Sequence, residues 1–171
     1  MDFKTKIRDV ADFPKKGIIF RDIAPLLEDA NSFRLAIKEL TAPFRGKKVD
    51  KVVGIDARGF IFAGVIASEL GTGMVMIRKK GKLPFETENQ KYKLEYGESV
   101  LEIHTDSIKK GENVLLVDDV LATGGTMAAA IKLVEKVGGN ILGISFLIML
   151  DSLLKKEKIK DYPLFSLINY Q

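Results

Sequence analysis

Two adjacent carboxylates, placed directly before a loop rich in glycine and threonine, are the residues of this chain best suited to chemistry. Asp118 and Asp119 follow the apolar residues 114–117, and residues 123–126 of the loop read Thr-Gly-Gly-Thr. Glycines let a backbone approach a ligand closely, and free N–H groups at a helix start bind anions, here together with threonine hydroxyls. Carboxylates beside such a pocket indicate a ligand that also carries hydroxyls or a divalent cation. A sugar phosphate meets both requirements.

The elements that must position these residues follow from the apolar pattern. Residues 114–117 predict a buried strand, and residues 126–137 predict a helix. An unbroken apolar strand is typical of a parallel sheet covered on both faces, and ligands bind beyond the carboxyl ends of its strands. Residues 51–56 repeat the design, since a buried strand ends in Asp56 and is followed by Arg58, Gly59 and a helix to residue 70. The sequence therefore predicts an α/β fold.

The rest of the chain predicts further elements and one irregular stretch. We expect helices over 3–12, from 31 or 32 to about 44, and over 152–158, and strands over 74–78, 99–104, 141–150 and 163–168. Residues 18–20 are expected to be extended and residues 83–97 to hold no regular element. A long irregular stretch in a compact domain is usually a functional lid or a mobile segment. We find no linker or repeat, so residues 1–171 are expected to form a single domain.

Three features allow two interpretations each. The loop-like residues 21–27 are unusually apolar, and they are either an arm packed on the core or the wall of a site. The basic run 78–82 is either a solvated face or a group of cations that neutralises a bound anion at a strand end. His104, on the polar face of its strand, is either a surface residue or a catalyst, and we favour the surface.

Composition excludes several classes of function. The chain has no cysteine and one histidine, which removes thiol catalysis, disulfides and histidine metal clusters. The start lacks a signal peptide, and no apolar run reaches the roughly 20 residues that span a bilayer, so we expect a cytoplasmic protein without a membrane partner. A net charge of +4 suits a small anionic substrate and does not indicate nucleic acid. P-loop, dinucleotide-binding and serine-hydrolase motifs do not occur.

Residues 117–126 resemble the phosphoribosyl pyrophosphate (PRPP) signature of the type I phosphoribosyltransferases. Three more segments resemble the adenine-specific members: residues 13–23 their base-recognising hood, residues 54–62 their pyrophosphate loop, and residues 78–97 their basic strand end and mobile catalytic loop. The resemblance implies the type I fold, a Rossmann-like, mainly parallel sheet flanked by helices. It places the hood mainly at residues 1–30 and a flexible loop at about 82–98.

The resemblance also implies a reaction, in which adenine and PRPP give AMP and pyrophosphate with the help of Mg²⁺. The metal would be held mainly by PRPP and water, with no direct protein ligand. Lys79 and Lys82 could come from the neighbouring subunit, since the family forms homodimers. The peptide between Asp56 and Ala57 is expected in an unusual conformation.

Matched position by position, the resemblance gives each part of the substrates its residues. The 5′-phosphate would be bound by Ala122, Thr123, Gly124, Gly125 and Thr126, and the ribose by Asp118 and Asp119. Pyrophosphate would be bound by Arg58, Lys79 and Lys82, and adenine by Ile19, Phe20 and Arg21. Phe20 would stack on the purine while backbone groups read its edge, and Asp118 could also face the purine. Glu95 and Tyr96 would close over the site, with Glu95 as the catalytic acid or base.

Two other functions stay open at this point. One is a phosphoribosyltransferase for another purine, such as hypoxanthine or xanthine. The other is a PRPP-sensing gene regulator, although the chain has no spare residues for a helix-turn-helix domain and its charge excess is small. Phe85 stands at a position that varies in the family, which leaves the behaviour of the loop open.

Overall fold

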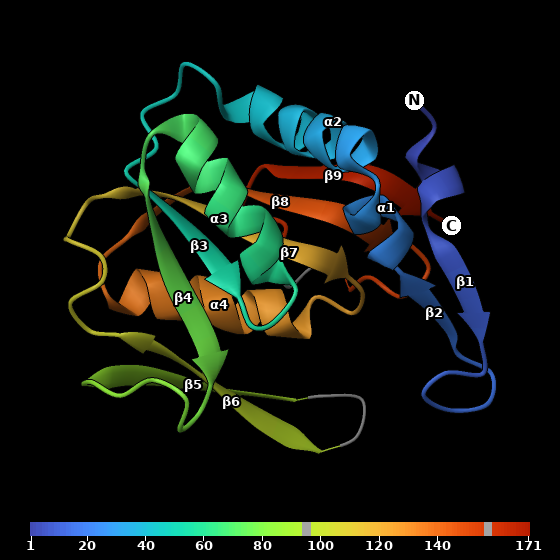
Figure 1. Ribbon diagram of the computed structural model, residues 1–171. Coiled ribbons are helices and arrows are strands. Elements are labelled where there is room, and N and C mark those ends of the chain that lie inside the picture. The colour runs from blue at the N-terminus through green and yellow to red at the C-terminus, as the bar shows by residue number, and fades with distance from the viewer. Residues whose placement is uncertain (94–96, 156–158) are drawn as a thin grey trace.

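A computed structural model describes residues 1–93, 97–155 and 159–171 of the chain (Figure 1). The elements are, in chain order, η1 (Phe3–Lys6), β1 (Arg8–Ala11), β2 (Ile19–Asp22), α1 (Ala24–Glu28), α2 (Ala30–Thr41), η2 (Ala42–Phe44), β3 (Lys51–Ile55), α3 (Gly59–Leu70), β4 (Gly73–Lys79), β5 (Thr87–Lys93), β6 (Glu98–His104), β7 (Asn113–Leu121), α4 (Gly125–Lys136), β8 (Asn140–Leu150) and β9 (Leu164–Tyr170). None of the helices described has both the length and the apolar character that a bilayer crossing demands.

A seven-stranded sheet of order β5-β6-β4-β3-β7-β8-β9 forms the centre of the structure. The strands from β4 to β9 in this order run parallel, while β6 pairs antiparallel with both β4 and β5. Helices α2 and α3 cover one face of the sheet and α4 covers the other (Figure 1). The predicted mainly parallel α/β fold is therefore confirmed.

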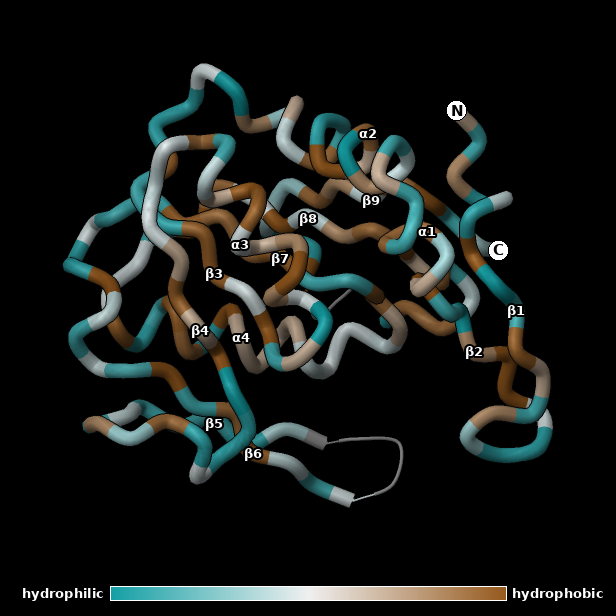
Figure 2. The backbone as a smooth tube through the Cα atoms, in the orientation of Figure 1, coloured by the Kyte–Doolittle hydropathy of each residue, from teal (hydrophilic) through white to brown (hydrophobic). Residues whose placement is uncertain are grey.

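Alternate side chains of β7 enter two separate hydrophobic cores. Val114 and Leu116 pack with residues of α4, whereas Leu115 and Val117 pack with residues of α2 and α3. Successive side chains of a strand point to opposite faces, so a strand between two helical layers must be apolar at every position. The largely brown colour of β3 in Figure 2 agrees with this pattern.

The chain adds its next parallel strands on opposite sides of the neighbouring strands β3 and β7. The chain passes from β3 through α3 to β4 on one side, and from β7 through α4 to β8 on the other. The pairing of β7 with β3 ends at Val117, but its pairing with β8 continues to Leu121. Asp118 and Asp119 thus lie inside β7, not after its end as expected, and they line a notch above β3. Such a switch point is where open α/β sheets bind ligands.

The N-terminal segment forms a small hood beside the large sheet. The expected helix over 3–12 is wrong, because only Phe3–Lys6 form a 3₁₀ helix and β1 follows, paired antiparallel with β2. Cross-strand ion pairs join Arg8 to Asp22 and Asp9 to Arg21, and they outweigh the helical spacing of the few apolar residues. The extended residues 18–20 are confirmed in part by β2. The expected loop over 21–27 contains α1, whose first N–H donates to Asp22 Oδ1 at 3.0 Å.

Two further expectations about secondary structure are not met. Residues 87–93, expected to be irregular, form β5, because β6 supplies the hydrogen-bonding partners and Tyr92 packs against the core. An edge strand with one solvated side needs few apolar residues. The expected helix over 152–158 is absent from its described part, where Asp151–Leu153 form a turn, and residues 156–158 lie outside the described residues.

Candidate active site

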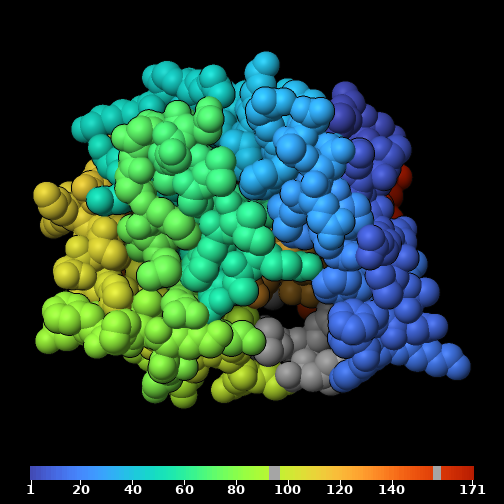
Figure 3. Space-filling view, in the orientation of Figure 1, coloured from blue at the N-terminus to red at the C-terminus, as the bar shows by residue number. Residues whose placement is uncertain are grey.

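A cavity of about 750 Å³ lies between the hood and the large sheet. The hood contributes Ile19, Phe20 and Arg21, and the loop after β7 with the start of α4 contributes Ala122, Thr123, Gly125 and Thr126. In the space-filling view a hollow opens between the blue N-terminal segment and the teal segment of the chain (Figure 3). The cavity brings together the predicted base-binding and phosphate-binding residues, which are about a hundred positions apart in the sequence.

The loop before α4 surrounds a small pocket at the place where its residues predict an anion. Gly124 has a left-handed backbone with φ of 81°, which favours glycine, and its carbonyl accepts the Ala128 N–H of the first helical turn. This turn of the chain surrounds a small pocket of about 90 Å³ that Asp118 also lines. The N–H groups of residues 125–127, which precede Ala128, have no acceptor within the helix, and the positive end of the helix dipole lies here, so this end of α4 is suited to an anion.

Asp118 and Asp119 share a second cavity, of about 330 Å³, with Arg58 and Lys79. Asp119 Oδ2 lies 2.7 Å from Arg58 Nε, and the Asp119 N–H donates to Asp118 Oδ1 at 2.9 Å. Burial and then the charge of Asp119 raise the pKa of Asp118 well above its usual range. Burial also raises the pKa of Asp119, although Arg58 opposes the shift. Two carboxyl groups held this close favour a ligand that donates hydroxyl hydrogens or brings positive charge.

Arg58 connects the two cavities, because its side chain lines both. It stands directly before α3, and the peptide between Asp56 and Ala57 just ahead of it is cis, which agrees with the unusual conformation that the sequence implied. Its guanidinium group lies 5.0 Å from the centroid of the Phe20 ring, as well as beside Asp119. Arg58 is therefore in contact with Phe20 of the hood and with the buried Asp119 at once.

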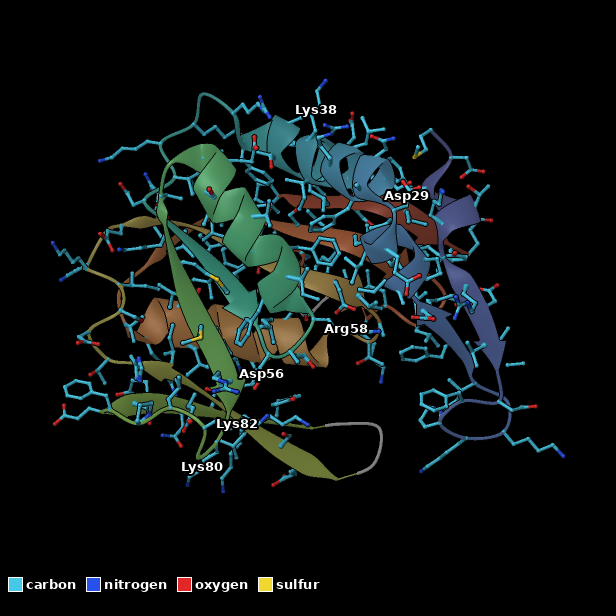
Figure 4. The ribbon with its side chains drawn as sticks, in the orientation of Figure 1. Asp29, Lys38, Asp56, Arg58, Lys80 and Lys82 are labelled. Atoms are coloured by element: carbon cyan, nitrogen blue, oxygen red, sulfur yellow. The ribbon has the colours of Figure 1, made fainter. Side chains whose placement is uncertain are left out.

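The basic run 78–82 divides between the cavity and a buried carboxylate. Lys79 lines the second cavity, whereas Lys82 Nζ and Arg78 Nε each lie 3.1 Å from Asp56 Oδ2. Figure 4 shows Asp56 and Lys82 close together at the ends of β3 and β4. Burial opposes ionisation of Asp56, but the hydrogen bonds and charges of Lys82 and Arg78 lower its pKa overall.

Glu102 holds the chain in place where this basic run ends. Its Oε1 accepts the Lys82 N–H at 2.9 Å and the Leu83 N–H at 2.8 Å, and the residue is 3% exposed. Burial opposes ionisation, but hydrogen bonds from the backbone of residues 81–83 lower the pKa of Glu102. The carboxylate therefore fixes the first residues of the expected catalytic loop.

Aromatic and ionic contacts fix the base-binding side of the hood. The Phe20 ring meets the Phe13 ring edge-on, with centroids 5.2 Å apart. The Arg21 guanidinium lies 3.9 Å from the centroid of the Tyr170 ring and forms an ion pair with Asp9. Of residues 21–27 only Arg21 lines the large cavity, whereas the apolar Ile23 and Leu26 are buried in the core beside α2 and α3. For these apolar residues the arm packed on the core, one of the two interpretations left open, is therefore the correct one.

Some residues that the sequence singled out lie outside the described residues or outside one or both of the large cavities. Glu95 and Tyr96 lie outside the described residues. Asp118 does not line the large cavity, although Val120 and Ala122 from the same part of the chain do. Lys82 lines neither large cavity. His104, on β6, lies outside both cavities as well.

Sequence reasoning missed a group of residues that line the large cavity from the ends of β8 and β9: Leu150, Ser152, Leu153 and Tyr170. They form no motif. Their only signal was that Leu150 closes a predicted buried strand, at the sheet edge where ligands bind. Sequence reasoning also assigned Asp56 no role other than that of a charge at the end of its strand.

Comparisons with known proteins give consistent results. The Phosphoribosyl transferase domain family matches residues 26–171. An adenine phosphoribosyltransferase of Geobacter metallireducens is 52% identical over 169 residues, which are 99% of each chain. The crystal structure of the adenine phosphoribosyltransferase from Thermoanaerobacter pseudethanolicus has a TM-score of 0.95 at 47% identity and covers 99% of this chain and 98% of its own. The crystal structure of the adenine phosphoribosyltransferase from Saccharomyces cerevisiae, in a complex that contains adenine, has a TM-score of 0.91 at 38% identity and covers 97% of this chain and 96% of its own.

Proposed function

The chain belongs to the phosphoribosyl transferase family and to its adenine-specific members, and on this premise we propose which of its residues carry the reaction. It transfers the 5-phosphoribosyl group from PRPP to adenine and releases AMP and pyrophosphate, a pentosyltransferase reaction of purine salvage. The observation that carries the assignment of residues is the large cavity, which has an aromatic hood on one side and an anion-binding helix start on the other. We also propose that residues 1–171 act as one phosphoribosyltransferase domain.

Adenine binds against the hood in this proposal. The Phe20 ring stacks on the purine, Ile19 packs at its side, and backbone groups of Phe20 and Arg21 read its edge. Backbone groups are suited to this, because the Arg21 guanidinium is already engaged by Asp9 and Tyr170. A flat apolar ring with a polar edge matches a cavity that combines aromatic walls with a few convergent polar groups.

The 5′-phosphate of PRPP binds at the start of α4, where backbone N–H groups of Ala122 to Thr126 and the hydroxyls of Thr123 and Thr126 surround it. The ribose hydroxyls donate to Asp118 and Asp119. Pyrophosphate binds at Arg58 and Lys79, which line the cavity beyond these carboxylates. Lys82 joins them on release from Asp56, whose Oδ2 lies 3.1 Å from Lys82 Nζ.

The bond between the anomeric carbon and the pyrophosphate oxygen breaks, the bond from that carbon to N9 of adenine forms, and adenine loses its imidazole N–H proton, through a sugar with oxocarbenium character. Asp118 and Asp119 lie where they stabilise the developing positive charge, and the basic residues stabilise the leaving group. Arg58 leaves Asp119 for pyrophosphate, so the Asp119 carboxylate becomes able to face the sugar. Glu95 accepts or donates the proton of the purine, and Tyr96 closes the site with it and excludes water.

We propose that Mg²⁺ reaches the site on PRPP and water. Within the described ranges no group of three or more histidine, cysteine, aspartate or glutamate side chains is placed to hold a metal. The nearby Asp56 and Asp119 are also each paired with a cation of the protein. Such residues suit a cation carried by the substrate oxygens. When bound, Mg²⁺ would neutralise charge on the pyrophosphate group.

Two copies of the chain would meet, in our proposal, at an exposed apolar face on α3 and β4. Ile61, Val65 and Met76 are exposed there although each is a large apolar side chain. Burying them between copies would form the expected homodimer. Ile61→Glu should then yield monomers in analytical ultracentrifugation, whereas a monomeric unaltered protein would contradict the dimer. We further propose a cytoplasmic location and no nucleic-acid or membrane partner.

The experiment that tests the substrate offers adenine, hypoxanthine, xanthine and guanine with PRPP and Mg²⁺ and follows pyrophosphate release. Adenine should be used far better than the 6-oxopurines, because a site built to accept the hydrogens of an amino group leaves polar groups unpaired when an oxygen replaces it. Faster turnover of hypoxanthine than of adenine would overturn the assignment of the base.

A further inference from the structure

We propose that Tyr170 is a positioning residue of the adenine subsite: its ring holds the Arg21 guanidinium and thereby sets where the backbone of Phe20 and Arg21 meets the purine. The proposal rests on the function proposed for the large cavity. It concerns a residue at the end of β9 that no motif marks and that reaches the base through another side chain.

The hood depends on side-chain contacts for its position. Strands β1 and β2 form a two-stranded sheet of their own, and neither pairs with a described strand of the seven-stranded sheet. The two sheets stand apart in Figure 1, with the hood beside the end of β9. Since no backbone ladder joins the hood to the sheet, the separation between Phe20 and the cavity floor must be fixed by side chains.

Tyr170 supplies such a contact for two separate segments of the hood. Its ring centroid lies 3.9 Å from the Arg21 guanidinium carbon and 5.2 Å from Lys4 Nζ. The Arg21 side chain is only 17% exposed and forms its ion pair with Asp9, its cross-strand neighbour in β1. A guanidinium held by a carboxylate and an aromatic face has little freedom, and cation–π contacts gain strength as they lose water.

The ring is itself held by the large sheet. Tyr170 pairs with Leu150 of β8, and its carbonyl accepts the Asp151 N–H at 2.8 Å. Leu150 and Tyr170 both line the cavity. Strands β8 and β9, which form the floor of the cavity, thus also carry the Tyr170 ring, and this ring anchors the hood at the opposite wall of the cavity. Loss of the ring would free Arg21 and move Phe20, while the phosphate-binding loop before α4 would stay in place.

The test compares Tyr170→Leu with Tyr170→Phe and with Tyr162→Leu as the matched control. Tyr162 donates its hydroxyl to Glu135 and lines neither large cavity. For Tyr170→Leu we expect the KM for adenine to rise about tenfold, from the usual strength of a partly buried cation–π contact. The KM for PRPP and kcat at saturating adenine should change by less than about twofold. Tyr170→Phe keeps the ring and should match the unaltered enzyme, as should Tyr162→Leu.

A second variant separates positioning from direct contact with the base. Arg21→Met leaves the ring in place but removes its partner, and it should raise the KM for adenine as Tyr170→Leu does. The double variant should be no worse than Arg21→Met alone, because Arg21→Met already removes the contact with the ring, along with the ion pair to Asp9. If Tyr170 touched adenine directly, the two effects would multiply. If Tyr170→Leu fails to fold, Arg21→Met and Tyr170→Phe still decide the question.

Three results would overturn the proposal. One is an equal rise of both KM values in Tyr170→Leu, which would indicate general loosening of the fold. Another is a Tyr170→Phe variant as weak as Tyr170→Leu, which would assign the effect to the hydroxyl. The third is an unchanged KM for adenine. All three presuppose an unaltered enzyme that uses adenine, so inactivity of that enzyme with adenine would instead refute the function itself.

Discussion

Gly59, the first residue of α3, should tolerate no side chain. A Cβ atom at this position would lie 2.6 Å from Asp118 Oδ1 and 3.2 Å from both Asp118 Cα and the Val117 carbonyl oxygen. The carboxylate could rotate away from a new methyl group, but the two backbone atoms of β7 could not. Gly59→Ala must therefore push α3 away from β7 or displace the Asp118 carboxylate from its place in the site.

The size of this effect follows from two opposing contributions. Overpacking a well-packed contact costs about 1–3 kcal/mol. Replacing glycine by alanine in a helix recovers at most about 1 kcal/mol, and less at a first helical residue. We therefore expect a loss of about 1–2 kcal/mol in the free energy of unfolding, or a melting temperature lower by about 2–8 °C. Displacement of Asp118 should also lower kcat/KM for PRPP by about ten- to a hundredfold.

The same helix offers a matched control in Gly64. The nearest atom to a Cβ at Gly64 is Met74 Sδ at 3.7 Å, which is ordinary contact. Gly64→Ala should leave kcat/KM unchanged and raise the free energy of unfolding by up to about 1 kcal/mol, through helix propensity. Urea unfolding and initial-rate kinetics of both variants suffice. Equal stability and equal kcat/KM for the two variants would refute the reasoning.

Three other substitutions test the carboxylates. The raised pKa of Asp118 means that the folded protein keeps a proton that the unfolded chain has lost, so this group costs stability as pH rises above about 4. Asp118→Asn should gain stability over the unaltered protein between pH 5 and pH 8 in urea unfolding while kcat/KM for PRPP falls, and unchanged kinetics would show that the carboxylate is misassigned. Glu102→Ala leaves the N–H groups of Lys82 and Leu83 without their acceptor, and should lower the free energy of unfolding by about 2–4 kcal/mol. It should also raise the KM for PRPP more than the KM for adenine. Equal rises of the two KM values would speak against a role at the pyrophosphate side. Glu95→Ala should lower kcat more than the affinity for PRPP in single-turnover kinetics, and an equal loss of both would make Glu95 a positioning residue.

The sequence predicts those parts of the site that are local in the chain. Asp118, Asp119 and the Thr-Gly-Gly-Thr loop follow one another, and an apolar strand before them with a helix after them determines their place at a sheet edge. Arg58 could be placed by the same logic from β3 and α3. In these cases the residues that make the site and the residues that position it are neighbours.

What could not be predicted depends on partners far away in the chain. Lys82 turns to Asp56, 26 positions earlier, and not into either large cavity. Arg21 is held by Tyr170, and no periodicity links the second strand of the hood to the last strand of the sheet. Strand β5 is polar and exists because β6 pairs with it. Such pairings arise from the tertiary fold, so local propensity carries little trace of them.

The separation of the hood from the large sheet also bears on how such enzymes diversify. In the proposed site the base binds against β2 of the hood and the sugar phosphate binds at β7 and α4, and no described strand pairs across the two sheets. Mutations in the hood therefore leave the backbone pairing of the strand that carries the buried carboxylates intact, and they reach these carboxylates through the contact of Phe20 with Arg58. A lineage can exchange one nucleobase for another while it conserves its chemistry, and an engineer can graft a different hood onto the same catalytic sheet.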